Sequence, residues 1–246
     1  MAITFRVIGR PPGAMIDVGA HWGTTLAAFL ESGWTVYAFE PDPTNRAVLS
    51  SDYPGAIIDS RAISEIDGDT VALYTSDVST GISTLSPFHP THAASVEVET
   101  VRLDTYIHSH QIAKIDFLKT DVEGFDLFVL RTFPWETHHP RAVVCEFEDN
   151  KTSRLGYTVH DIAKFLEQKG YSVMVSEWYP VVEYGGNHKW RRFTHYPTDD
   201  IPSNSCGNLI AIEPRLLNQL VRECDSAGRK YRLRGRALAV KARWRR

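Results

Sequence analysis

Apolar runs alternate with amphipathic segments along most of the chain. An apolar run at residues 14–18 is followed by a glycine-containing turn and an amphipathic segment at 24–32, which Gly33 ends. Short apolar runs between turn residues predict strands, and apolar residues spaced three to four apart predict helices. We therefore expect further strands at 35–39, 56–59, 70–75, 95–101, 115–120, 142–147, 171–177 and 208–212, and helices at 43–51, 125–132 and 159–169.

Strands that alternate with helices in this way favour an α/β fold with a doubly wound, mostly parallel, Rossmann-like sheet. At 246 residues with 43% hydrophobic residues, the chain suits one domain, which we place at residues 1–213. We find neither a signal peptide pattern nor an apolar run that could span a bilayer, so we expect a cytoplasmic protein. Three widely spaced cysteines, Cys145, Cys206 and Cys224, predict reduced thiols rather than a disulfide framework or a zinc module.

Residues 214–246 form a basic C-terminal extension. Nine Lys or Arg residues and no acidic residue lie between Arg229 and Arg246. Such a segment could contact a membrane surface, an acidic protein or nucleic acid, and a solvated helix explains it equally well. Because the sequence shows no other basic stripe and no RNA-binding motif, we do not expect nucleic acid as a substrate.

The turn after the first strand has the features of a nucleoside-cofactor site. It contains Asp17, Val18, Gly19, Ala20, His21, Trp22 and Gly23. Glycines let the backbone pass close to a ligand at a helix N-terminus, and an acidic residue at the end of the second strand can accept hydrogen bonds from a ribose diol. Glu40, followed by Pro41, stands at that second position.

The spacing of the glycines separates two cofactor classes. A dinucleotide site has the pattern Gly-x-Gly-x-x-Gly, but here His21 stands in place of the second glycine. The pattern Asp-x-Gly-x-x-x-Gly is instead similar to the first motif of class I S-adenosylmethionine methyltransferases. An NAD site, or a turn that only closes a strand-helix unit, is the alternative interpretation.

Acidic residues follow two later strands at the same predicted edge of the sheet. Asp121 comes after the strand at 115–120, and Glu146 lies near the end of the strand at 142–147. Carboxylates there could bind Mg²⁺ through oxygen ligands, act as a general base, or offset a sulfonium charge. For Asp121 the alternative is a helix N-cap.

A long irregular segment, residues 178–205, is expected to project over this edge like a lid. It mixes aromatic side chains with hydrogen-bond donors, which suits stacking on a sugar ring. Within it, His188 and His195 are candidate catalytic bases. A lid that packs its aromatic residues inward is the alternative.

Taken together, these segments resemble the FkbM family of S-adenosylmethionine-dependent methyltransferases from about Met15 to Ile212. The resemblance is carried by residues 16–20 with Gly23, 39–41, 62–64 with Gly68, 81–85, 101–104, 115–124 and 208–210. It implies a class I methyltransferase fold and a cofactor site made of Asp17, Gly19, Ala20, His21, Gly23, Glu40, Pro41, Ala62, Ile63 and Asp121.

Residues 145–149 and 190–192 further resemble a subgroup found with glycan-building enzymes. By this analogy the expected reaction is O-methylation of a sugar hydroxyl on a glycan, glycolipid or glycosylated metabolite. Two alternatives remain open at this point. One is a non-catalytic partner of a glycan-assembly enzyme, and the other is an NAD-dependent sugar-modifying enzyme.

Overall fold

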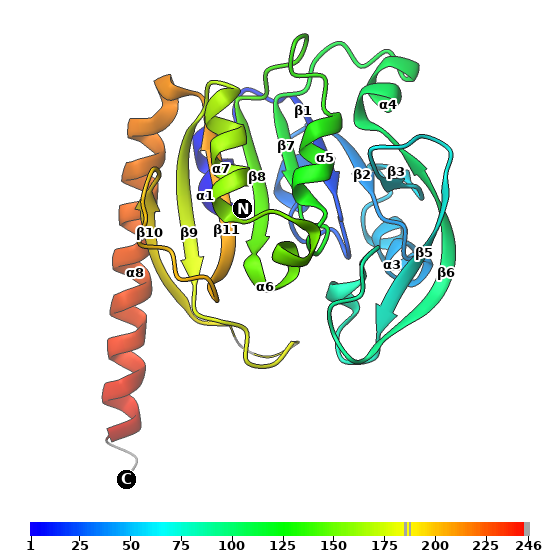
Figure 1. The fold of residues 1–246 in the computed structure, drawn as a ribbon. Helices are drawn as coiled ribbons and strands as arrows, with labels where there is room; N and C mark the ends of the chain where they lie inside the picture. Colours follow the sequence, from blue (N-terminus) through cyan, green and yellow to red (C-terminus); the bar gives the residue numbers. More distant parts are fainter. Residues whose placement is uncertain (185, 187, 244–246) are drawn as a thin grey trace.

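The computed structural model describes residues 1–184, 186 and 188–243, with side chains described as far as Leu233. Its strands form an eight-stranded sheet and a small three-stranded sheet (Figure 1). The strands are β1 Ala14–Val18, β2 Thr35–Phe39, β3 Ile57–Asp59, β4 Ala62–Ile63, β5 Thr70–Ser76, β6 His92–Val101, β7 Phe117–Thr120, β8 Ala142–Glu148, β9 Ser172–Trp178, β10 Trp190–His195 and β11 Cys206–Ile212. The helices are α1 Ala2–Ile8, α2 Ala27–Glu31, α3 Pro43–Asp52, α4 Leu103–Ser109, α5 Asp126–Thr132, α6 Asp149–Thr152, α7 Val159–Gln168 and α8 Leu217–Arg243, with 3₁₀ turns η1 Thr80–Ile82, η2 Ser153–Leu155 and η3 Pro214–Leu216.

The large sheet has the strand order β10-β9-β11-β8-β7-β1-β2-β3. Strands β3, β2, β1, β7 and β8 pair in parallel, whereas β11 is antiparallel to both β8 and β9. The chain order reverses beside β1, so the carboxyl ends of β1, β2 and β7 meet at a switch point where α/β proteins bind ligands. The predicted doubly wound, mostly parallel α/β fold is confirmed.

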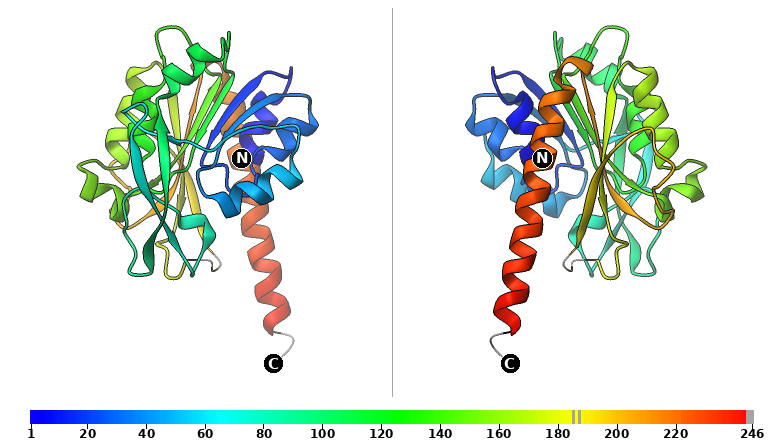
Figure 2. Two further views of the ribbon diagram at one scale, coloured as in Figure 1. Left: turned by 90° about the vertical axis from the view of Figure 1, so that its right-hand side faces the viewer. Right: turned by 90° about the vertical axis from the view of Figure 1, so that its left-hand side faces the viewer.

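Helices cover both faces of this sheet, as the two side views in Figure 2 show. Ile16 and Leu118 point into one apolar cluster with residues of α4, α5 and α7. Met15 and Phe117 point into the opposite cluster with residues of α1, α2 and α8. Because neighbouring strand residues face opposite sides, both faces of β1 and β7 are buried and their ends are held rigidly.

The last helix begins on the sheet and continues past it (Figure 1). Leu220 and Cys224 of α8 are buried in the same cluster as Met15. The predicted domain, residues 1–213, and the start of the predicted C-terminal extension therefore share one core. The basic residues from Arg234 onward lie outside the described side chains. Among the described helices, none combines the length and apolarity needed to cross a membrane.

The segment 178–205 differs from the expected irregular lid. Residues Trp190–His195 form β10, which pairs antiparallel with β9 at the sheet edge. Polar residues dominate this strand, so its sequence lacks the apolar run that predicts a buried strand. The strand forms because its backbone pairs with β9.

Candidate functional site

A cleft of about 600 Å³ lies at the carboxyl ends of β1 and β2 and beside β4, and we call it the glycine-turn cleft. Seven of the residues that the sequence analysis assigned to the cofactor line it: Gly19, His21, Glu40, Pro41, Ala62, Ile63 and Asp121. Glu40 and Pro41, which follow β2, and the residues of β4 therefore lie in one wall with the turn after β1.

Gly19 is a glycine because the chain passes very close to β7 at this point. Its φ is +75°, and a Cβ atom there would lie 2.0 Å from the carbonyl oxygen of Asp121. Its N–H and that of Ala20 both donate to the Phe39 carbonyl at 3.0 Å. The turn is thus fixed between β2 and the segment that follows β7.

Three of the predicted cofactor residues lie beneath the cleft wall. Asp17 is fully buried, and Ala20 packs in the apolar cluster that contains Met15. Gly23 has a φ of +78°, and a Cβ there would meet the rings and methyls of Tyr53 and Leu49 within 2.7 Å. Gly23 therefore lets the turn pack against α3. The motif pattern alone could not tell whether this glycine serves packing or contact with a ligand, and the structure shows the packing reason.

Glu40 presents a buried carboxylate to the cleft. One oxygen accepts the His21 N–H at 2.7 Å, and the other accepts the Asp42 N–H at 2.9 Å. Burial raises the pKa of Glu40 to about 7, although these two hydrogen bonds favour the ionised form. The carboxylate is held in one orientation, as recognition of a diol requires.

Asp17 pairs with Lys119, a residue that the sequence analysis did not single out. The two stand opposite each other in the parallel register of β1 and β7, and Lys119 Nζ lies 3.0 Å from Asp17 Oδ1. The ammonium also donates to the Gly19 carbonyl at 2.5 Å and lies 3.7 Å from Asp121 Oδ2. The available signal was a lysine that directly follows the apolar pair Phe117 and Leu118 in the predicted strand 115–120.

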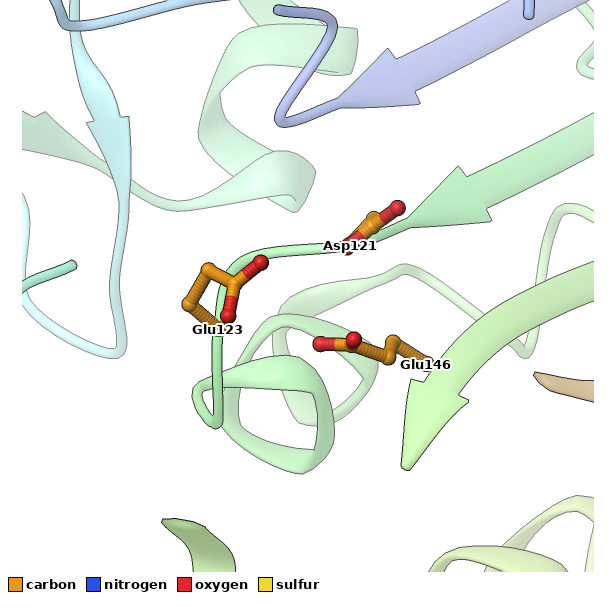
Figure 3. A group of neighbouring side chains, drawn as sticks. All are labelled: Asp121, Glu123 and Glu146. Carbon is orange, nitrogen blue, oxygen red and sulfur yellow. The ribbon is translucent and has the colours of Figure 1, made fainter. Parts of the chain in front are cut away.

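Three carboxylates from β8 and the turn after β7 come together beside the cleft (Figure 3). Asp121, Glu123 and Glu146 each offer one oxygen, and these oxygens lie within 4.8 Å of one another. The sequence analysis gave Asp121 and Glu146 as candidate metal ligands, and the structure adds Glu123 to this group. Burial raises the pKa of Glu123 to about 7, and burial with the Glu123 charge raises the pKa of Glu146 well above its usual value.

Lys151 of α6 places its ammonium group among these carboxylates. It is ion-paired with Glu123, lies 2.9 Å from Glu148 and lies 3.4 Å from Glu146. Burial lowers the pKa of Lys151, but the Glu146, Glu123 and Glu148 carboxylates outweigh that effect and the net shift is strongly upward. Lys151 is therefore charged, and it neutralises part of the acidic cluster.

A second cavity adjoins the glycine-turn cleft, and we call it the Lys151 cavity. It shares Gly81 and Glu123 with the first cleft, and its wall also includes Trp178, Tyr184 and His188. Tyr184 donates its hydroxyl to Glu148 at 3.1 Å. The sequence analysis expected His188 at this edge, and that is where the structure has it.

His195 lies elsewhere, so its expected position over the carboxyl edge is wrong. It ends β10 and stands opposite Met174, near the start of β9. Because β10 runs antiparallel to β9, the end of β10 lies at the amino edge of the sheet, away from both cavities. The lid expected from the sequence is split by this strand, and the described residues of the segment that line the cavity are Trp178, Val181, Tyr184 and His188.

Comparison with known proteins shows similarity to methyltransferases. Residues 17–173, more than half of the chain, match the family model described as the methyltransferase FkbM domain. The hexuronic acid methyltransferase AglP of Haloferax volcanii is 27% identical over 169 residues, which are 65% of this chain and 64% of that protein, so the match spans less than two thirds of the relative.

Solved structures of methyltransferases are also similar to this chain. The precorrin-6y C5,15-methyltransferase from Geobacter metallireducens GS-15 is 12% identical, with a TM-score of 0.44 over 86% of each chain. The magnesium protoporphyrin IX methyltransferase (ChlM) from Synechocystis PCC 6803 with bound SAH is 11% identical, with a TM-score of 0.44, covering 86% of this chain and 80% of that one.

Proposed function

The chain belongs to the FkbM family of S-adenosylmethionine-dependent methyltransferases, and we propose that it methylates a hydroxyl oxygen of a sugar-containing acceptor. The observation that carries this proposal is the junction of two cavities at Glu123, one walled by the glycine turn and Glu40 and the other by aromatic and polar side chains. The name of the Haloferax volcanii relative, a hexuronic acid methyltransferase, supports a sugar as the acceptor class.

In this proposal the glycine-turn cleft holds the methyl donor. The Gly19–His21 turn faces the amino-acid end of the cofactor, Glu40 accepts hydrogen bonds from the ribose hydroxyls, and Ala62 with Ile63 packs on the adenine. The fit rests on a buried, oriented carboxylate next to an apolar wall, which suits a nucleoside. S-adenosylmethionine supplies a methyl group that is already activated, so the protein contributes alignment and exclusion of water.

Asp121 and His188 are the proposed groups for the acceptor hydroxyl. The acceptor oxygen attacks the methyl carbon, the carbon–sulfur bond breaks with its electron pair remaining on sulfur, and the hydroxyl proton passes to a base on the protein. Asp121 lines the glycine-turn cleft, and His188 lines the Lys151 cavity. Each could accept that proton from its own side of the junction.

The expected magnesium ligands, Asp121 and Glu146, share their surroundings with Lys151. A divalent ion between Glu123 and Glu146 would lie next to the Lys151 ammonium, which is already 3.4 Å from Glu146. The ion and the ammonium group are both positive, and like charges bound to the same carboxylate repel strongly in a buried site. These residues in this arrangement therefore do not fit a divalent ion, and the proposed reaction uses none.

Calorimetric titration with S-adenosylhomocysteine and with NADH, each with and without Mg²⁺, tests the cofactor. We expect saturable binding of S-adenosylhomocysteine, none of NADH and no effect of Mg²⁺. The exposed variant Glu31→Gln is the matched control and should bind like the unaltered protein. Binding of NADH alone would overturn the proposal.

Methyl transfer from labelled S-adenosylmethionine to a panel of glycosides tests the reaction. We expect the label to appear on a sugar oxygen, with S-adenosylhomocysteine released in equal amount. Cofactor binding without transfer to any glycoside would instead favour the non-catalytic partner of a glycan-assembly enzyme.

A further inference from the structure

The Lys151 cavity is built differently from an anion-binding site. Its wall contains three carboxylates, those of Glu123, Glu146 and Glu148, and Lys151 supplies the cationic group among them. The lysine side chain is only 3% exposed and contacts all three carboxylates. The ammonium group donates to Glu123 and Glu146 and is ion-paired with Glu148, so its charge is already committed to carboxylates of the wall.

The cavity also has an aromatic wall at its outer side. Trp178, the last residue of β9, and Tyr184 both line the cavity, and Tyr184 is oriented by its hydrogen bond to Glu148. The Lys151 ammonium lies 5.6 Å from the Tyr184 ring centroid, which further fixes that ring. Aromatic faces next to oriented carboxylates suit a polyhydroxylated ring, because its C–H face packs on the aromatic side chain and its hydroxyls donate to the carboxylates.

The two arginines of the neighbouring segment are committed to other carboxylates. Arg191 and Arg192 both pair with Glu177 at 2.6 Å, and Arg192 also pairs with Asp200. The sequence analysis expected the hydrogen-bond donors of this segment to serve a sugar ligand. In the described part of the segment, these guanidinium groups instead tie β10 to β9 and to the loop after it.

From this arrangement we propose that the Lys151 cavity is the acceptor site and that it selects a neutral or amino sugar over one that carries a carboxylate. This inference takes the sugar acceptor from the proposed function. The preference for one charge class of sugar is new. A carboxylate on the acceptor would lie beside Glu123 and Glu148 with no uncommitted cation in the described wall of the cavity. Like charges in a partly buried cavity repel, whereas hydroxyl or ammonium donors find acceptors there.

Ligand-observed NMR titrations of the S-adenosylhomocysteine-loaded protein at pH 8 test the charge preference. The probes are the methyl glycosides of glucose, glucosamine and glucuronic acid and the corresponding galactose series, so that charge and stereochemistry vary separately. We expect the neutral or amino glycoside of at least one series to bind about tenfold more tightly than its uronide.

Three variants locate the binding. Tyr184→Ala should weaken the preferred glycoside at least about fivefold by removing an aromatic face, and Glu148→Gln should reduce the difference between neutral glycoside and uronide. Val182→Ser, in the same segment and 99% exposed, should change neither.

Equal or tighter binding of the uronides overturns the charge preference. Binding that Tyr184→Ala leaves unchanged, or the absence of sugar binding to protein that does bind S-adenosylhomocysteine, overturns the assignment of the cavity. Failure to bind S-adenosylhomocysteine would instead refute the proposed function, so the two failures are distinguishable.

Discussion

The charge state of Glu40 should control cofactor affinity. The proposed ribose contact needs the carboxylate form, because both oxygens then act as acceptors. Burial raises the pKa of Glu40 to about 7, so lowering the pH below 7 protonates it in the free protein. At pH 8 about ten in eleven Glu40 side chains are ionised, and at pH 6 about one in eleven. The affinity for S-adenosylhomocysteine should therefore fall about tenfold from pH 8 to pH 6.

Two variants separate Glu40 from its neighbours in this experiment. Glu40→Gln keeps the shape of the side chain but loses the charge, so its affinity should be at least about tenfold weaker at pH 8 and nearly independent of pH. Glu123 lines the same cleft and its pKa is also raised to about 7, so Glu123→Gln is the matched control. It should retain the pH dependence of the unaltered protein.

Calorimetry between pH 5.5 and pH 8 in buffers of different ionisation enthalpy measures both the affinity and the proton released on binding. Near pH 6 the protein should release close to one proton per cofactor, because binding selects ionised Glu40. An affinity that stays constant over this range, or a pH dependence lost in Glu123→Gln rather than in Glu40→Gln, would refute the assigned role of Glu40.

Three further outcomes are expected. Asp121→Ala should lower methyl transfer at least about 100-fold while S-adenosylhomocysteine still binds, and turnover like that of the unaltered protein would rule out its proposed role. Lys119→Met should lower the free energy of unfolding by about 3–5 kcal/mol, because Asp17 is left as an unpaired buried charge; urea denaturation measures this, and adding Asp17→Asn should recover part of the loss. His195→Ala should leave turnover within about twofold because this residue lies at the amino edge, whereas His188→Ala should reduce it about tenfold or more, and the reverse order would contradict the placement of the base.

The main sheet could be predicted from the sequence because its strands are buried on both faces. The runs at 14–18, 35–39 and 142–147 are mostly apolar, with Asp17 and Glu146 as their charged residues, and they became β1, β2 and most of β8. The strand β10 could not be predicted in this way. It is an edge strand rich in polar residues, and it exists because β9 offers unpaired backbone groups to it.

The acidic and glycine positions of the site could be predicted because they follow strands that end at one edge. Asp121 and Glu146 come from separate segments, and the parallel pairing of β7 with β8 brings them together. The roles of the lysines could not be predicted in the same way. Lys151 lies on a short helix after β8, and its contacts with Glu123 depend on how that helix packs, which no local pattern encodes.

Two buried lysines explain which acid at this edge can act on a ligand. Lys119 holds Asp17, and Lys151 holds Glu123 and Glu148, whose side chains are 0%, 10% and 6% exposed. Asp121 lies 3.7 Å from Lys119, and its side chain is 41% exposed. Lys119 offsets most of the charge of Asp17, and Lys151 offsets only part of the charge of the carboxylates around it, whereas the more exposed Asp121 keeps its negative field toward the cleft. Asp121 is therefore the carboxylate best placed to act on a positively charged donor or on an acceptor hydroxyl.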